Sequence, residues 1–224
     1  MKTRKSGVGV VCSIFTLKIS IPQRLKQNSY TVRLDLRMGI SALNANSGLQ
    51  IFFLIDCSDG VAGEINKVVE AINSIVPALQ KANSLYPRMN MKARAMRFST
   101  GAYFVSPAAM DIDRFKVSNI FAGGTCDMGK AFDTLYEQIK FITPEAGGVP
   151  PVIVLISNGR PTDDYQKSLA NLRTLKSFQQ AIRWSYAIGP NPDKQMLLEF
   201  AGLQSNVREL NNMDAIPRAF EPGR

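Results

Sequence analysis

The stretch Leu-Gln-Ile-Phe-Phe-Leu-Ile-Asp-Cys-Ser-Asp-Gly, residues 49–60, decides the fold. Its first part, Leu49–Ile55, is a nearly continuous apolar run, typical of a central parallel strand that is buried on both faces of a sheet. The polar turn Asp56–Gly63 follows at once. A strand that ends this way places carboxylate and hydroxyl oxygens at the carboxyl edge of a sheet, where open α/β sheets bind ligands.

Outward from this stretch, the apolar spacing predicts alternating helices and strands. Ile65–Leu85 has apolar residues three and four apart, as a helix packed on a sheet would. Further strands are predicted at Met91–Phe98, Tyr103–Val105, Val152–Ile156, Trp184–Ile188 and Val207–Leu210, and further helices at Met128–Phe141, Asp163–Gln180, Pro192–Ala201 and Met213–Phe220. The order predicts an α/β, doubly wound, mostly parallel central sheet with helices on both faces, Rossmann-like, with one short antiparallel edge strand.

Length and charge indicate one domain with an N-terminal extension. The chain has 224 residues, enough for one sizeable core. Residues 1–37 hold eight Lys or Arg against one acidic residue, whereas residues 38–224 hold 19 against 17. We expect a basic, irregular extension and linker over 1–47, a domain over 48–220 and a tail over 221–224. Met38 is an alternative start of the chain, because the orderly pattern begins after it.

The extension carries its own expectations. Thr16–Ile21 and Tyr30–Leu36 alternate apolar and polar residues, as short half-buried strands do. The rest of the chain is nearly neutral, which argues against the continuous positive surface that nucleic-acid binding needs. Binding of nucleic acid by the basic segment alone stays a third alternative.

Residue types that are rare or missing exclude several chemistries. The chain has no histidine, which excludes Ser-His-Asp and Cys-His catalysis and His-ligated zinc. The cysteines, Cys12, Cys57 and Cys126, are too few for a disulfide framework and fit a reducing cytoplasm. No apolar run reaches the length of a membrane span, and no signal-peptide cleavage site follows the basic N-terminus. A bound metal would therefore need oxygen ligands and be a hard ion.

Three polar turns share one kind of chemistry. They are Asp56–Gly60, Gly123–Thr125 and Ser157–Asp164, each after a predicted strand or before a predicted helix. Each turn offers hydroxyl, amide or carboxylate oxygens at the carboxyl edge of the sheet. A hard cation such as Mg²⁺ prefers a ring of such oxygens from separate loops.

These turns resemble the metal-ion-dependent adhesion site (MIDAS) of the von Willebrand factor A (vWA) family, which consists of D-x-S-x-S, a Thr before a helix and an Asp after the fourth strand. Asp56 and Ser58 match the first motif, Thr125 matches the Thr, and Asn158 stands at the position of the Asp. The stretch 158–164 is similar to the T-D-G-x-P-T-D-D pattern of bacterial members, and the chain resembles the TerY-like group of tellurium-resistance and stress loci. The resemblance covers about residues 49–220.

The resemblance implies a non-enzymatic protein-interaction module. Its metal ligands would be Asp56, Ser58, Thr125 and Asn158, and its ion Mg²⁺, or Mn²⁺ or Ca²⁺. A partner protein would present an acidic side chain to the ion. The partner would also contact residues beside these ligands, namely Asp59, Gly60, Gly124 and Gly159. The setting would be a cytoplasmic bacterial stress system.

Two departures from the pattern weaken the predicted ion site. Gly60 replaces the second Ser, and Asn158 replaces the Asp, so a hydroxyl ligand and a negative charge are lost. Because affinity for hard cations follows the charge and number of ligands, we expect weak binding or none. A metal-free vWA scaffold is therefore one alternative. Another is a metal-dependent phosphohydrolase with Asp56 as its nucleophile.

Each motif also has a purely structural interpretation. Asp56 and Ser58 could form a turn and a helix N-cap, and Thr125 is an equally good N-cap. Asn158 with the following glycine could be a simple tight turn. Asp163 and Asp164 are predicted to cap the helix that follows them.

Overall fold

The structure, a computed structural model, describes residues 48–142, 149–218 and 220. The predicted extension over 1–47 and the tail over 221–224 lie outside the described residues. The strands are β1 Gln50–Asp56, β2 Lys92–Ser99, β3 Gly101–Phe104, β4 Met110–Asp111, β5 Val152–Ser157, β6 Ile182–Ala187 and β7 Val207–Glu209. The helices are α2 Ile65–Leu85, α3 Met128–Ile139, α4 Tyr165–Thr174, α5 Lys176–Gln179, α6 Lys194–Ala201 and α7 Ala215–Arg218.

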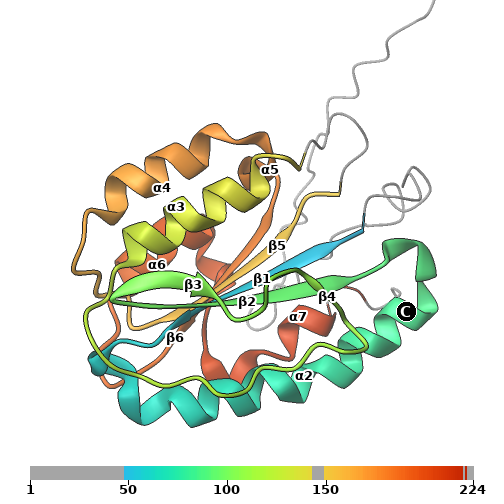
Figure 1. The fold of residues 1–224 in the computed structure, drawn as a ribbon, viewed down its shortest axis with the longest axis horizontal. Coiled ribbons are helices and arrows are strands. Elements are labelled where there is room, and N and C mark those ends of the chain that lie inside the picture. The colour runs from blue at the N-terminus through green and yellow to red at the C-terminus, as the bar shows by residue number, and fades with distance from the viewer. Residues whose placement is uncertain (1–47, 143–148, 219, 221–224) are drawn as a thin grey trace, which may run out of the picture. The chain divides into compact units, whose positions relative to one another are not determined.

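The strands form one sheet in the order β3-β2-β1-β5-β6-β7, with β4 also paired to β2 (Figure 1). β1 pairs in parallel with β2 and β5, β5 with β6, and β6 with β7. Only β3 and β4 run antiparallel, both against β2. The predicted mostly parallel sheet and its antiparallel edge strand are confirmed, and β4 is an addition that its two-residue length hides in the sequence. The carboxyl ends of β1, β5 and β6 therefore meet at one edge.

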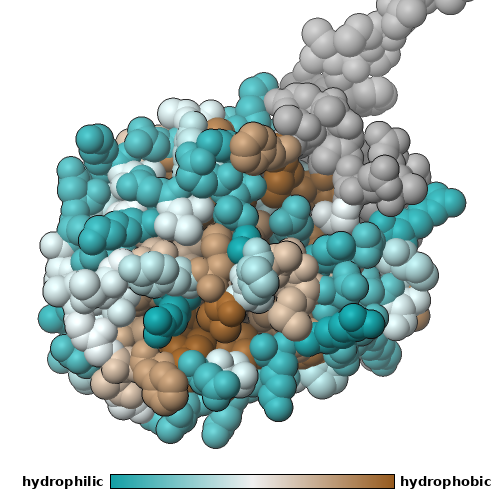
Figure 2. Space-filling model, in the orientation of Figure 1, coloured by the Kyte–Doolittle hydropathy of each residue, from teal (hydrophilic) through white to brown (hydrophobic). Residues whose placement is uncertain are grey.

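Helices cover both faces of the sheet, with α2 and α7 on one and α3, α4 and α6 on the other (Figure 1). Successive residues of β1 feed the two cores: Phe53 and Ile55 pack with α2, whereas Phe52 and Leu54 pack with α3. This division explains why β1 is apolar without alternation, since a strand covered on both faces has no solvent side. Figure 2 shows a mostly polar surface with one apolar hollow beside β3.

The single helix predicted at Asp163–Gln180 is wrong, because the chain forms α4 and α5 with a break at Leu175. Leu175 has extended dihedrals (φ −81°, ψ 129°) and packs against the core on the α3 side. The bend brings Phe178 into the same core, where it is buried. Tertiary packing of these two side chains outweighs the helical spacing. The other predicted helices keep their places, with ends shifted by up to two residues at most boundaries and the last one reduced to α7.

Candidate functional site

Loops at the carboxyl edge of the sheet are joined by backbone hydrogen bonds into one surface, which we call the rim. It comprises residues 56–60, 121–126, 157–162 and 188–193. The N–H of Gly123 donates to the carbonyl of Cys57 (2.7 Å), and that of Asp59 donates to the carbonyl of Gly124 (3.0 Å). Thr162 N–H donates to the carbonyl of Cys126 (2.8 Å). The three predicted turns are thus brought together.

Asp193 joins the fourth loop to the rim, because its N–H donates to the carbonyl of Asn158 (2.7 Å). This loop follows β6 and was not predicted as part of the site. It lies there because parallel pairing of β5 and β6 ends both strands at the same edge.

Asp56 is the centre of the rim and is fully buried. Its Oδ1 accepts hydrogen bonds from the N–H (2.9 Å) and the Oγ (2.7 Å) of Ser58. Its Oδ2 accepts from Oγ of Ser157 (2.6 Å) and from the thiol of Cys126 (3.5 Å). Both carboxylate oxygens are therefore occupied by donors from three loops, and the group ties these loops together.

The two thiols beside this carboxylate are buried and protonated. Burial, and then the nearby Asp56 carboxylate, raise the pKa of Cys57 to about 12. The same two causes raise the pKa of the Cys126 thiol well above its ordinary range. Cys57 donates weakly to the carbonyl of Ile55 (3.5 Å). Thiols that stay protonated are poor nucleophiles and poor metal ligands.

The hydroxyl of Thr125 turns to a separate polar cluster. It donates to Oδ1 of Asp127 (3.0 Å) and lies 3.1 Å from Oγ1 of Thr100. Lys130 contacts the other oxygen of Asp127 (2.6 Å), and this hydrogen bond is the main cause that lowers the pKa of the Asp127 carboxyl. Thr125 is exposed, so its hydroxyl remains accessible from solvent.

Asn158 is nine-tenths buried and holds its own turn together. Its Oδ1 accepts from the N–H of Arg160 (3.0 Å). Its Nδ2 faces Gly60, because a Cβ added to Gly60 would lie 2.9 Å from that atom. The predicted interpretation of Asn158-Gly159 as a turn thus has direct support in the Asn158–Arg160 hydrogen bond.

The residues predicted to contact a partner differ in exposure. Asp59, Gly60 and Gly124 are exposed on the rim. Gly159 is buried, because it lies against the backbone of Asp193, whose oxygen would be 2.5 Å from an added Cβ. Its positive φ of 72° also favours glycine. Gly159 therefore shapes the turn from below the surface.

Three residues of the site were missed by sequence reasoning as functional groups. Ser157 ends the apolar strand β5, and only its place before the Asn158 turn could have signalled its bond to Asp56. Thr100, which contacts Thr125, has no sequence signal. Asp163 was predicted to cap the helix after it. Instead it accepts from the N–H groups of Gly129 (2.9 Å) and Lys130 (3.0 Å), at the start of α3.

The donor set fits a divalent ion poorly. The carboxylate of Asp56 is already bonded to its neighbours, and Oδ1 of Asn158 accepts from Arg160. At Gly60 no side-chain ligand exists, and the nearest side-chain atom is an amide donor, which repels a cation. Among the described residues, no group of three or more His, Cys, Asp or Glu side chains could hold a metal.

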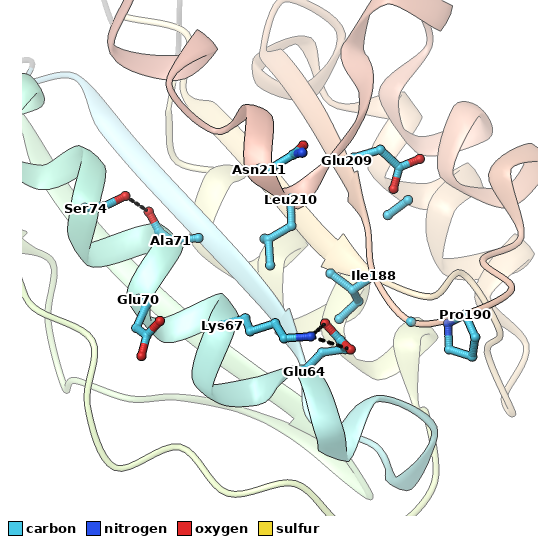
Figure 3. A pocket seen from close by; sticks show the side chains of 12 residues that line it. Glu64, Lys67, Glu70, Ala71, Ser74, Ile188, Pro190, Glu209, Leu210 and Asn211 are labelled. Atoms are coloured by element: carbon cyan, nitrogen blue, oxygen red, sulfur yellow. Dashed lines mark hydrogen bonds and ion pairs between the residues drawn. The ribbon is translucent and has the colours of Figure 1, made fainter.

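A pocket of about 690 Å³ opens beside the rim, between α2, the loop after β6 and the segment after β7 (Figure 3). It shares Gly189 with the rim, and Gly189 lies close to both Asn158 and Gly60. Its floor is apolar, with Ile188 and Leu210, and its mouth carries Glu64, Lys67, Glu70 and Glu209. Lys67 pairs with Glu64 (3.2 Å), as Figure 3 shows.

The sequence matches the family model of the von Willebrand factor type A domain over residues 50–221. Comparison with curated proteins found no match. Among solved structures, BatB from Bacteroides thetaiotaomicron is similar with a TM-score of 0.52 at 14% identity, covering 77% of this chain and 97% of that one. Manganese-loaded TRAP protein from Plasmodium vivax has a TM-score of 0.55 at 16% identity, covering 79% of this chain and 74% of that one.

A third similar structure is proximal thread matrix protein 1 from the mussel byssus with a zinc-occupied MIDAS motif. It has a TM-score of 0.50 at 14% identity and covers 80% of this chain and 46% of that one. At these identities the likeness concerns the fold alone. In the described part of the chain, no helix is both long and apolar enough to span a membrane.

Proposed function

The chain belongs to the von Willebrand factor type A domain family, and from this premise we propose that it is a protein-interaction module whose rim binds a partner protein. Domains of this family often mediate interactions between proteins. The proposal extends this general role to the loops at the carboxyl edge of the sheet, where open α/β sheets place their ligands.

Phe121 is the observation that carries the proposal. Its ring is 74% exposed, although the chain around it is held firmly. Ile120 before it is buried, Ala122 after it packs against the core on the α2 side, and Gly123 bonds to Cys57. An aromatic side chain fixed in water beside the rim is a typical anchor of a protein interface, because it contributes large contact area at little entropic cost.

Asp56 is a poor candidate for the nucleophile of a phosphohydrolase. It is fully buried, and donors from Ser58, Ser157 and Cys126 occupy both of its oxygens. Attack on phosphorus would need a free oxygen that reaches the substrate. We therefore favour a non-enzymatic role, and a screen with generic phosphoesters should detect no turnover that depends on Asp56.

Affinity capture from the source cells tests the proposed interaction. The immobilised protein should retain a partner that the variant Phe121→Ser loses. Leu203→Ser is the matched control, because Leu203 is also an exposed apolar residue (55%) but follows α6, away from the rim. Equal capture by both variants would refute the rim as the binding surface.

The metal-dependent version of this function needs Asp56, Ser58, Thr125 and Asn158 to hold Mg²⁺, Mn²⁺ or Ca²⁺. The occupied oxygens of Asp56 and the donor beside Gly60 favour the metal-free version of the scaffold. A bound ion would supply a positive charge for an acidic side chain of the partner. Its predicted weak affinity is tested below by thermal melts.

The cellular setting is an extension of the resemblance to the TerY-like group. We propose a cytoplasmic role in a bacterial tellurium-resistance or stress system. Bacteria that lack the protein should then tolerate less tellurite, and the wild-type protein should restore tolerance better than Phe121→Ser. Unchanged tolerance would contradict this setting and leave the proposed interaction untouched.

A further inference from the structure

Gly60 and Asn158, the positions at which the chain departs from the metal-site pattern, lie against each other. A Cβ on Gly60 would be 2.9 Å from Nδ2 of Asn158, closer than real Cβ contacts allow, and 3.9 Å from Oγ of Ser58. The Asn158 amide thus occupies the space that a longer side chain at position 60 would need. The two departures form one structural change.

This change places a hydrogen-bond donor where a cation site needs an acceptor. Because Oδ1 of Asn158 accepts from the N–H of Arg160 (3.0 Å), the other end of the amide, Nδ2, must face Gly60. The side chain is only 9% exposed. No acceptor for Nδ2 is found among the residues that the structure describes. A buried donor without an acceptor is unfavourable, so this atom calls for a ligand that accepts.

Arg160 adds a positive charge to the same turn. Its Nε donates to the carbonyl of Asn191 (3.0 Å), which anchors the exposed side chain to the loop after β6. Within the described ranges, the guanidinium has no carboxylate partner. Its two Nη groups can therefore bind an incoming acid, for which a guanidinium is well suited.

We infer that the Gly60–Asn158 step binds a carboxylate of the partner protein directly, with the Asn158 amide as donor and the Arg160 guanidinium as the neighbouring positive charge. The inference rests on the proposed function and names the chemistry that the rim recognises. Asp59 is the opposing charge in this region: it is exposed, and its Oδ1 lies 3.9 Å from the place of a Cβ on Gly123.

Acetate is a suitable probe, titrated into the full-length ¹⁵N-labelled protein and followed by NMR, with sodium chloride at matched ionic strength as reference. The backbone amide of Gly60 and the side-chain amide of Asn158 should shift and saturate with acetate but not with chloride. The side-chain amide of Asn206 donates to the carbonyl of Arg183 (2.9 Å) and should not move.

Variants separate the parts of the step, with the Gly60 amide as the common reporter. Arg160→Gln should weaken acetate binding severalfold, Asp59→Asn should strengthen it, and Asn158→Asp should abolish it. The inference is overturned if acetate gives no saturable shift, if Asn158→Asp responds like the wild type, or if Mg²⁺ rather than acetate moves Gly60.

Failure here is distinguishable from failure of the proposed function. If acetate does not bind but Phe121→Ser still loses the partner, only the carboxylate inference fails. If acetate binds but Phe121→Ser captures the partner as well as Leu203→Ser does, the proposed function fails, and the inference falls with it.

Discussion

At the scale of single residues, the rim depends on Asp56. Its carboxylate accepts four hydrogen bonds from three other residues, and all of these groups are buried. Replacing it by alanine leaves those donors without an acceptor, which costs more than the hydrogen bonds themselves contribute. The burial of a charge offsets part of the stabilisation, so the net effect is smaller than the number of bonds suggests.

Asp56→Ala should therefore lower the free energy of unfolding by roughly 3 kcal/mol, measured by urea denaturation. Asp59→Ala is the control, because Asp59 is exposed in the same loop and its removal should change stability by about 0.5 kcal/mol or less. Similar losses for both variants would show that Asp56 does not tie the loops together.

Gly159 provides a second test at this scale. Its φ of 72° and the oxygen of Asp193, 2.5 Å from an added Cβ, leave no room for a side chain. Gly159→Ala should destabilise the protein by about 1–3 kcal/mol in the same urea experiment. Gly63→Ala should have little effect, since nothing lies within 4 Å of its added Cβ. If both substitutions are tolerated equally, the turn is less constrained than the structure indicates.

At the scale of elements, helix α3 is capped by a residue far away in the sequence. Asp163 accepts from the N–H groups of Gly129 and Lys130, where a negative charge also complements the helix dipole. Asp164 caps α4 with a longer hydrogen bond to Lys167 (3.4 Å). The contact from Asp163 therefore joins two elements that local sequence does not connect.

Asp163→Ala should cost about 1–2 kcal/mol of stability, more than Asp164→Ala, which should cost about 0.5 kcal/mol. The order is the informative result, because sequence alone assigns both residues to the same helix. Amide hydrogen exchange should show faster exchange in the first turn of α3 for Asp163→Ala only. Faster exchange in α4 for that variant would support the sequence-based assignment.

At the scale of the whole molecule, divalent ions provide the clearest test of the site. A ligand that binds only the folded state stabilises it by about 2.7 kcal/mol at a hundred times its Kd, which moves a melting midpoint by several degrees. We expect millimolar Mg²⁺, Mn²⁺ or Ca²⁺ to leave the wild-type midpoint close to its value in EDTA. The double variant Gly60→Ser with Asn158→Asp regains a hydroxyl and a carboxylate and should respond to the ions.

A rise in the wild-type midpoint that Asp56→Ala and Thr125→Ala both abolish would instead establish a working ion site. The comparison must be made relative to each variant in EDTA, because Asp56→Ala also lowers stability without any ion.

Deletion of residues 1–37 is a second test of the whole molecule. The basic extension shows no pattern of a core element as regular as that of the domain, so the truncated protein should melt within about 2 °C of the full chain. Circular dichroism at identical protein concentration would measure this. A much lower midpoint would mean that the extension contributes to the folded domain.

The sequence by itself determined the fold class and the approximate place of most elements. Apolar runs and apolar residues at helical spacing are local properties, and they located α2 with its observed ends, Ile65–Leu85, and β1 to within one residue. Because parallel strands end at a common edge, the sequence also indicated that the turns after β1 and β5 would meet there.

Only the tertiary structure decided how the groups in those turns are used. The break at Leu175, the cap from Asp163 and the bond from Ser157 to Asp56 all depend on residues far apart in the chain. The orientation of the Asn158 amide toward Gly60 is of the same kind. Local sequence sets which hydrogen-bonding groups are present, whereas packing between distant segments determines which of them bond to each other and which are left for a ligand.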